Sequence, residues 1–161
     1  ELNGVRTVLQ QGGANVVVLS KSGQEALGVN KEKIQPDGMI VDWNKKIKVE
    51  SKYHAVILIG GKGAKKSLWD DPIVPQILAD HYRFGSIIGA MGAAIVVLIK
   101  TSLVTGEVPM PDDEATYIEL KNLNAVCVDV PVTSVENVVL GQGRSSVDEF
   151  SKKIIDLIET K

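Results

Sequence analysis

The sequence has a single cysteine, Cys127, and only two histidines among its 161 residues. One thiol excludes an internal disulfide framework and is compatible with a reducing compartment, so we expect a cytoplasmic protein. His54 and His81 stand far apart along the chain, which argues against a site built from several histidines. We therefore expect neither a metal ion nor a cofactor.

Long apolar runs and an excess of one charge are also missing. No stretch has the length of a transmembrane helix, and no signal-peptide pattern opens the chain. The net charge is -2, with lysines and glutamates scattered through the chain, so no basic face for nucleic acid is expected. Hydrophobic residues make up 44% of the chain and charged residues 24%, which is typical of a globular domain. We expect one domain over residues 1–161, with no membrane or nucleic-acid partner.

Short β-branched runs alternate with helical patterns, which predicts an α/β fold: a three-layer, flavodoxin-like, doubly wound and mostly parallel sheet. Apolar spacing predicts a first helix over residues 2–11. Ser146 and Glu149 have the spacing of a capping box that would begin the last helix. The remaining predicted elements are strands over 16–19, 38–43, 54–59, 86–90, 125–130 and 135–140, the last two as a pair, and helices over 72–82 and 112–121.

One expected element has no counterpart in this pattern. A doubly wound sheet opens with a strand, whereas this chain opens on a helix. That first strand lies in the middle of a flavodoxin-like sheet. Without it, two rows of backbone donors and acceptors would have no hydrogen-bond partners. We therefore expect the chain to lack an N-terminal strand, with an unfilled slot beside residues 54–59 or a strand from another chain in it.

The stretch Ser86–Leu98 is built like a nucleophile elbow, with a short buried strand, small residues and then a helix. Met91 stands where the nucleophile would be expected. A thioether has no proton to lose, so Met91 cannot attack a carbonyl. If it occupies the turn, its φ angle should be positive, because the turn must aim the side chain back over the sheet.

Three segments in this order resemble the ThiJ/PfpI superfamily, which includes protein deglycases and PfpI-type intracellular proteases and has a class I glutamine amidotransferase-like fold. These segments are Ala55–Gly61, the elbow around Met91, and Gly141–Phe150. Members of this family use an elbow cysteine, a glutamate near the first helix and often a histidine. The resemblance places Glu1 at the acid, Met91 at the cysteine and Met110 at a later histidine, with the amides of Gly61 and Gly92 as oxyanion donors.

Other polar and aromatic residues have simpler explanations. Cys127 alternates with valines, as a small buried residue on a strand does. Aspartates at predicted helix starts are explained by capping. Gly60–Gly63 lacks the spacing of a P-loop, so turn geometry explains it better than phosphate binding. We interpret the histidines and tryptophans as structural, packing or interface residues: His54, His81, Trp43 and Trp69.

Three functions remain open. The first is a non-catalytic protein of this type that binds a small molecule or a protein in a remodelled pocket, a role connected with stress. The second is a hydrolase, deglycase or glyoxalase-like enzyme with an unrecognised nucleophile, or with a water molecule activated by Glu1. The third is an assembly domain like the C-terminal domain of large-subunit catalases. The resemblance also implies a homodimer, for which the region around Trp43 is a contact surface.

Overall fold

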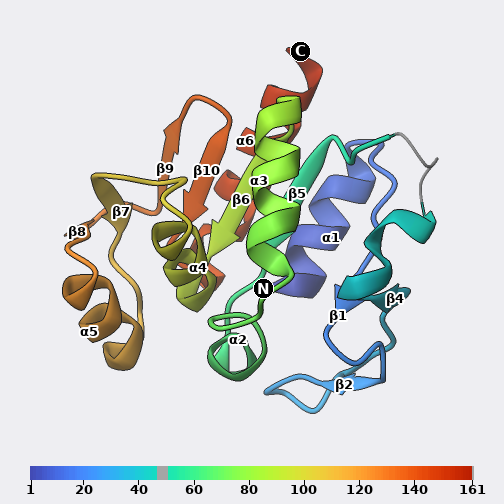
Figure 1. Ribbon diagram of the computed structural model, residues 1–161, viewed down its shortest axis with the longest axis horizontal. Helices are drawn as coiled ribbons and strands as arrows, with labels where there is room; N and C mark the ends of the chain where they lie inside the picture. The colour runs from blue at the N-terminus through green and yellow to red at the C-terminus, as the bar shows by residue number, and fades with distance from the viewer. Residues whose placement is uncertain (47–50, 161) are drawn as a thin grey trace.

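A computed structural model describes residues 1–46 and 51–160. Its main sheet has four strands in the order β5-β6-β10-β9. The first three run parallel and β9 runs antiparallel to β10. The mostly parallel sheet of the predicted α/β fold is therefore present (Figure 1). The bounds are β5 (Ala55–Leu58), β6 (Ile87–Met91), β10 (Val138–Gly141) and β9 (Val132–Val135).

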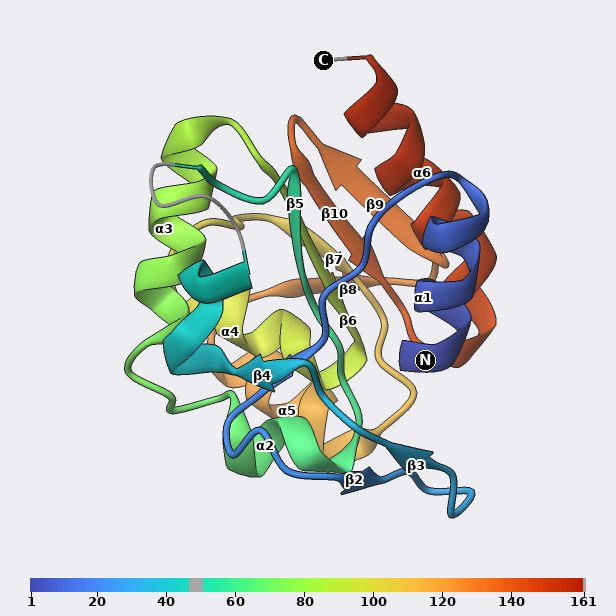
Figure 2. The same ribbon diagram turned by 90° about the vertical axis from the view of Figure 1, so that its right-hand side faces the viewer.

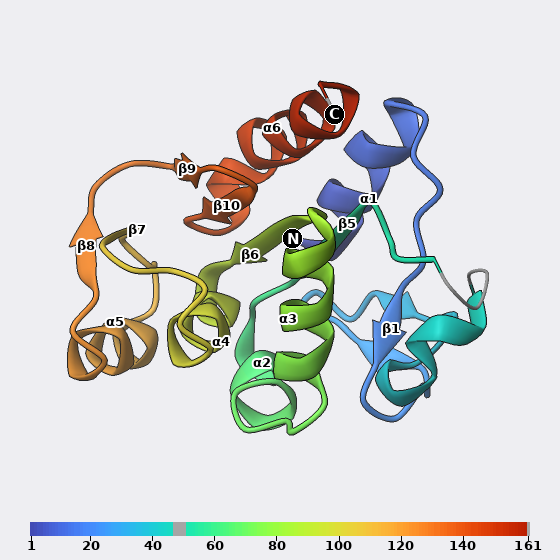
Figure 3. The ribbon, with the colours of Figure 1, turned by 45° about the horizontal axis from the view of Figure 1, so that its top comes forward.

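Three two-stranded pairs flank the main sheet. The β1–β4 pair and the β7–β8 pair are parallel, and β2–β3 is an antiparallel hairpin. Figure 3 shows β7–β8 with helix α5 on one side of the molecule and β1 on the opposite side. Their bounds are β1 (Leu19–Ser20), β4 (Gly38–Met39), β2 (Ala26–Leu27), β3 (Lys33–Ile34), β7 (Glu107–Pro109) and β8 (Val126–Val128).

Helices cover both faces of the main sheet (Figure 2). Helices α1 and α6 pack together on one face, while α2, α3 and α4 cover the other and α5 packs on α4 and β8. The bounds are α1 (Leu2–Gln11), α2 (Lys62–Ser67), α3 (Val74–Phe84), α4 (Ile95–Lys100), α5 (Glu114–Asn122) and α6 (Val147–Glu159). Short 3-10 helices are η1 (Ile40–Lys46), η2 (Gly92–Ala94) and η3 (Arg144–Ser146).

The core has two halves, one on each face of β6. Ile88 packs toward α3 and α4, while Ile87 packs toward α1 and α6, as expected for alternate residues of a strand covered on both faces. All five residues of β6 are buried. Helix α1 has the predicted bounds because Val5 and Leu9, one turn apart, are its buried residues.

Four local predictions are wrong. The 125–130 and 135–140 segments do not pair; β8 pairs with β7, and β10 lies between β6 and β9. Of the predicted 16–19 strand, only Leu19 lies in a ladder, as the first residue of β1. Beyond β4 the predicted 38–43 strand becomes η1. The Ser146 side chain makes no cap bond to α6, because its hydroxyl instead bonds to the backbone of Gly143. The sequence also predicts a polar stretch over residues 44–52, and part of it, residues 47–50, lies outside the described residues.

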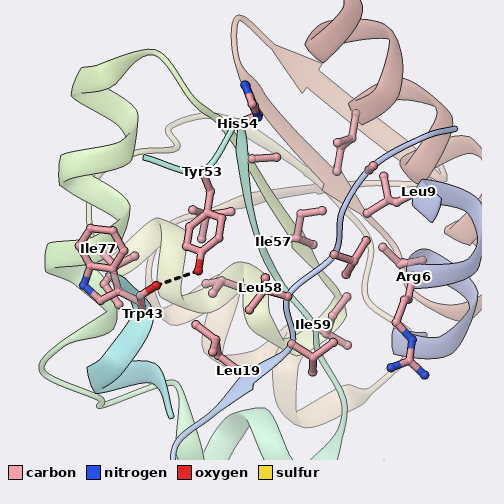
Figure 4. A pocket seen from close by; sticks show the side chains of 18 of the residues that line it. Arg6, Leu9, Leu19, Trp43, Tyr53, His54, Ile57, Leu58, Ile59 and Ile77 are labelled. Carbon is pink, nitrogen blue, oxygen red and sulfur yellow. Dashed lines mark hydrogen bonds between the residues drawn. The ribbon is translucent and has the colours of Figure 1, made fainter. Parts of the chain in front are cut away.

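The expected unfilled slot beside residues 54–59 is present. Within the part of the chain that the structure describes, β5 is an edge strand of the four-stranded sheet and pairs with β6 alone. A cavity of about 1480 Å³ separates it from the segment 14–20, which carries Val16, Val17 and Val18 (Figure 4). The three valines are half-buried.

Candidate functional site

The elbow turn is made by Gly92 and not by Met91. Met91 ends β6 in an extended conformation with φ -132° and ψ 134°. Gly92 follows with φ +57° and begins η2, which leads into α4. The prediction of a positive φ at Met91 is therefore wrong by one position. Glycine lacks a β-carbon, so it adopts a left-handed conformation without the cost that a side chain would impose.

Met91 is a core residue. It is fully buried and packs with Val5, Phe150 and Ile154 under helices α1 and α6. Its Cε atom lies 3.1 Å from the position that a β-carbon on Gly141 would occupy. This packing explains why a large apolar residue ends the strand directly before the turn.

The carboxyl group of Glu1 faces the elbow. A β-carbon on Gly92 would lie 3.7 Å from Oε1 and 4.0 Å from Oε2 of Glu1, and 3.8 Å from the carbonyl oxygen of Gln142. These are ordinary van der Waals separations, so a side chain would fit between the two groups. The predicted proximity of Glu1 to the elbow is thus found, although at Gly92 rather than Met91.

Burial raises the pKa of the Glu1 carboxyl. The positive charge of Arg144 opposes this rise, while the negative charge of Asp112 adds to it. The Oε2 atom is buried and has no hydrogen-bond partner among the described residues. An unpartnered carboxyl oxygen in a shielded position can accept a hydrogen bond from a bound molecule when ionised, or donate one when protonated.

Asp112 and Gly143 complete the surroundings of Glu1. A β-carbon on Gly143 would lie 2.9 Å from Oδ2 of Asp112 and 3.5 Å from Oε1 of Glu1. The sequence interpretation assigned Asp112 to helix capping, whereas Asp113 is the residue that accepts a hydrogen bond from Thr116 N–H and caps α5. A helix has one N-cap position, so only one of two adjacent aspartates can occupy it. The pair of aspartates in the sequence therefore indicated that one of them, here Asp112, is not needed for capping.

The Gly60–Gly61 turn packs directly against the elbow. A β-carbon on Gly60 would collide with the carbonyl oxygen of Met91 and lie 2.7 Å from the nitrogen of Ala93. Gly61 has φ +127° and precedes α2, with open space beside its α-carbon. The close approach fixes the backbone of the two turns relative to each other. The assignment of the Gly61 and Gly92 amides as oxyanion donors stays a prediction.

The remaining predicted residues lie elsewhere. Met110 follows β7, and its N–H donates to the carbonyl of Val128, so its relation to a family histidine stays a prediction. Cys127 is half-buried on β8, and burial raises the pKa of its thiol. Such a thiol is a poor nucleophile. His54 is exposed, while His81 is fully buried in α3 and contacts Trp43.

Neither a metal site nor a membrane span is indicated in residues 1–46 and 51–160. No group of three or more histidine, cysteine, aspartate or glutamate side chains there is placed to hold a metal ion. No helix in the same ranges combines the length and the apolar character that crossing a bilayer requires.

The fold and the site define an α/β domain with a strand–turn–helix elbow faced by a glutamate. The family model of the DJ-1/PfpI family matches residues 1–157, and the chain belongs to this family. The resemblance to the ThiJ/PfpI superfamily inferred from the sequence is confirmed.

Two related proteins are similar in sequence to this chain over most of its length. The chain is 25% identical over 155 residues to protein dj-1beta of Drosophila melanogaster, covering 96% of this chain and 80% of that protein. It is 28% identical over 156 residues to glutathione-independent glyoxalase DJR-1.2 of Caenorhabditis elegans, covering 94% and 77%.

Solved structures show the same fold. The crystal structure of Drosophila melanogaster DJ-1beta matches with a TM-score of 0.81 at 24% identity, over 99% of this chain and 83% of that chain. A ThiJ/PfpI domain protein from Brachyspira murdochii matches with a TM-score of 0.82 at 19% identity, over 98% and 87%. These matches confirm the predicted fold class.

Proposed function

We propose that this chain is a non-catalytic member of the DJ-1/PfpI family that binds a small molecule at the elbow. The observation that supports the proposal is the glycine at the turn. Gly92 has the positive φ of an elbow but offers no side chain to attack a substrate. Met91 beside it is buried in the core and has no acidic proton. The chain therefore lacks a nucleophile where covalent catalysis would need one.

The groups around Gly92 indicate what kind of molecule would bind. The position of a side chain there is bordered by the Glu1 carboxyl and the Gln142 carbonyl oxygen. A carbonyl oxygen accepts hydrogen bonds, and so does an ionised carboxylate. A small molecule with a hydroxyl or amino group complements this pair.

A second candidate function rests on the raised pKa of Glu1. A carboxyl group with a raised pKa is a stronger base when ionised, so Glu1 could activate a bound water molecule or remove a proton from a carbonyl compound. The Caenorhabditis elegans relative is named a glyoxalase. Under this alternative the chain would be an enzyme without a covalent intermediate.

Methylglyoxal consumption separates the two functions. We expect the chain to consume methylglyoxal no faster than buffer, and the Glu1→Gln variant to behave identically. Turnover by the unaltered chain that is lost in Glu1→Gln would overturn the non-catalytic proposal and support the alternative. Binding is measured with ethanolamine and glycolate as probes, by following the amide NMR signals of Gly92 and Gly143. We expect ethanolamine to shift both signals; no shift with either probe would contradict the binding role.

The elbow assignment itself is tested with a matched pair of cysteine variants. A Gly92→Cys thiol would face Glu1, whereas a Met91→Cys thiol would lie in the core. After mild peroxide treatment, mass spectrometry should show sulfinic acid at position 92 well before any oxidation of Cys127 or of a cysteine at 91. Equal oxidation at positions 91 and 92 would show that a side chain at position 92 does not face Glu1.

Self-association and location remain part of the proposal. We propose a homodimer in which the region around Trp43 and the β2–β3 hairpin, which precedes it in the chain, form the contact. Leu27 and Val29 of the hairpin are 67% and 69% exposed, and Val41 is 52% exposed. Light scattering should show a dimer that Leu27→Glu dissociates; a monomer at all concentrations would contradict it. The single cysteine supports a cytoplasmic location.

A further inference from the structure

The indole ring of Trp69 joins the elbow to the segment that contains α2. Its Nε1–H donates a hydrogen bond to the carbonyl oxygen of Ala93 over 2.7 Å, at the short end of the range for N–H···O bonds. Ala93 follows Gly92 directly in η2, so this bond holds a peptide group just beyond the turn. Trp69 is 9% exposed, so water has little access to the bond.

Trp69 is itself held from several sides. Its backbone N–H donates to the carbonyl of Ala64 in α2 over 3.1 Å. The ammonium groups of Lys65 and Lys100 lie 5.4 Å and 5.8 Å from the centroid of its ring, within the range of cation–π attraction. The same ammonium group of Lys100 lies 3.2 Å from the carboxylate of Asp70, the residue after Trp69. These contacts keep the indole N–H directed at the elbow.

A turn made by glycine needs such support from outside. Gly92 has φ +57°, and a glycine adopts positive and negative φ about equally well, so it does not fix the turn by itself. Before the turn, the carbonyl of Met91 lies against Gly60, where a β-carbon would collide with it. After the turn, the carbonyl of Ala93 is held by Trp69. One segment, residues 60–69, therefore contacts the elbow on both sides of its glycine.

Holding a carbonyl group also directs the N–H of the same peptide group. No cis peptide bond occurs in the described residues, and in a trans peptide the C=O and N–H point in opposite directions. With the Met91 carbonyl against Gly60, the N–H of Gly92 points away from that turn. With the Ala93 carbonyl on Trp69, the N–H of Ala94 points away from the indole. Contacts with residues 60–69 thus orient two backbone donors of the elbow.

We propose that Trp69 is a positioning residue for the elbow. Its indole N–H acts through the carbonyl of Ala93 and sets the conformation of the turn at Gly92. Trp69 is not among the groups nearest to the position of a side chain on Gly92, so its effect on a ligand there is indirect. The effect on ligand affinity rests on the proposed binding of a small molecule at Gly92, whereas the effect on the turn does not.

The test removes the N–H and keeps the ring. In the chain of residues 1–161, 3-benzothienylalanine at position 69 retains two fused rings with sulfur in place of the N–H. The matched control is 5-fluorotryptophan at the same position, which keeps the N–H. With the sulfur analogue, we expect amide exchange at Gly92 and Ala94, followed by NMR, to quicken by roughly tenfold or more, with no change at Ile88 in β6. The dissociation constant of ethanolamine, measured from the Gly92 amide signal, should rise roughly three- to tenfold.

The 5-fluorotryptophan protein should match the unaltered protein in both measurements. The same natural substitution at the two tryptophans gives a second comparison. Trp69→Phe should reproduce the result of the sulfur analogue, and Trp43→Phe should leave exchange at Gly92 and Ala94 unchanged.

Four results would count against the proposal. Unchanged exchange at Gly92 and Ala94 with the sulfur analogue would overturn it. Equal quickening with 5-fluorotryptophan, or equal quickening at Ile88, would assign the effect to ring packing or to global stability and would also overturn it. Quickened exchange with an unchanged dissociation constant would overturn the effect on binding. If ethanolamine shifts no signal of the unaltered protein, the proposed binding function fails, while quickened exchange at Gly92 and Ala94 alone still supports the positioning role.

Discussion

The backbone N–H of Tyr53 donates a hydrogen bond to Nε2 of His81 over 3.2 Å. The other ring nitrogen of His81, Nδ1, lies 2.8 Å from the carbonyl oxygen of Ile77. Since a carbonyl only accepts and a backbone N–H only donates, the imidazole is neutral with its proton on Nδ1. Protonation of Nε2 would place a hydrogen against the Tyr53 donor, within a buried aromatic cluster that includes Trp43.

This arrangement predicts a loss of stability in acid. Burial lowers the pKa of His81 from 6.5, against the opposing effect of the Ile77 carbonyl. A lowered histidine pKa stabilises the folded state above pH 6.5, and this contribution is lost as the pH falls through 6.5 toward the folded-state pKa. We expect the free energy of unfolding to fall over this range, measured by urea denaturation with tryptophan fluorescence. His81→Gln should flatten the dependence, and the exposed His54→Gln control should retain it.

Glu1 predicts a pH dependence of the opposite direction. A carboxyl whose pKa is raised by burial stabilises the fold while protonated, and that contribution is lost as the pH rises from 4.5 through the folded-state pKa. Glu1→Gln stays neutral, so its melting temperature should increase relative to that of the unaltered chain between about pH 4 and about pH 8. Calorimetry across this range measures the difference. A constant difference between the two melting curves would contradict the burial of an ionisable Glu1.

The contact between the glycine turn and the elbow predicts a large difference between two glycines three positions apart. Gly60→Ala should destabilise the fold by about 1–3 kcal/mol or more, because its methyl group collides with the Met91 carbonyl. Gly63→Ala, inside α2 with open space around it, should be neutral or stabilising by up to about 1 kcal/mol. Urea denaturation measures both. Similar stabilities for the two variants would refute the close approach.

Because Met91 lies in the core, truncating its side chain should leave a cavity and destabilise the fold. Truncating a methionine that lined a solvent-filled site would cost much less stability. Met91→Ala should destabilise by about 2–5 kcal/mol, since the side chain is fully buried among apolar neighbours. Met39→Ala, at a position 38% exposed, should change stability by less than about 0.5 kcal/mol. A small loss for Met91→Ala would mean that the side chain lies in a solvent-filled pocket instead.

The sequence predicted the elements well where periodicity defines them. Helix α1 has the predicted bounds because its apolar spacing has one interpretation, and the apolar runs of β5 and β6 lie within a residue or two of their predicted places. Pairing was harder. A β-branched run indicates a strand but does not indicate which strand lies beside it. The sequence therefore predicts a pair between the segments that form β8 and β10, whereas β8 pairs with β7 and β10 pairs with β6.

The one-residue error at the elbow has a different cause. Small residues surround Met91 and Gly92 on both sides, so residue size does not indicate where the strand ends and the turn begins. The glycine itself was the available signal, since a positive φ strains any other residue. The burial of Glu1 and the role of Asp112 beside it could not be predicted, because both depend on contacts between distant segments.

The collision that excludes a side chain at Gly60 has an evolutionary consequence. The elbow is supported by backbone contacts between two turns, and these contacts do not involve a side chain at position 92. Some glycine codons differ from cysteine codons at the first base alone, and the space between Glu1 and Gln142 admits a small side chain. A lineage with this scaffold can therefore lose a thiol at position 92, or acquire one beside the carboxyl group of Glu1, by a single base change.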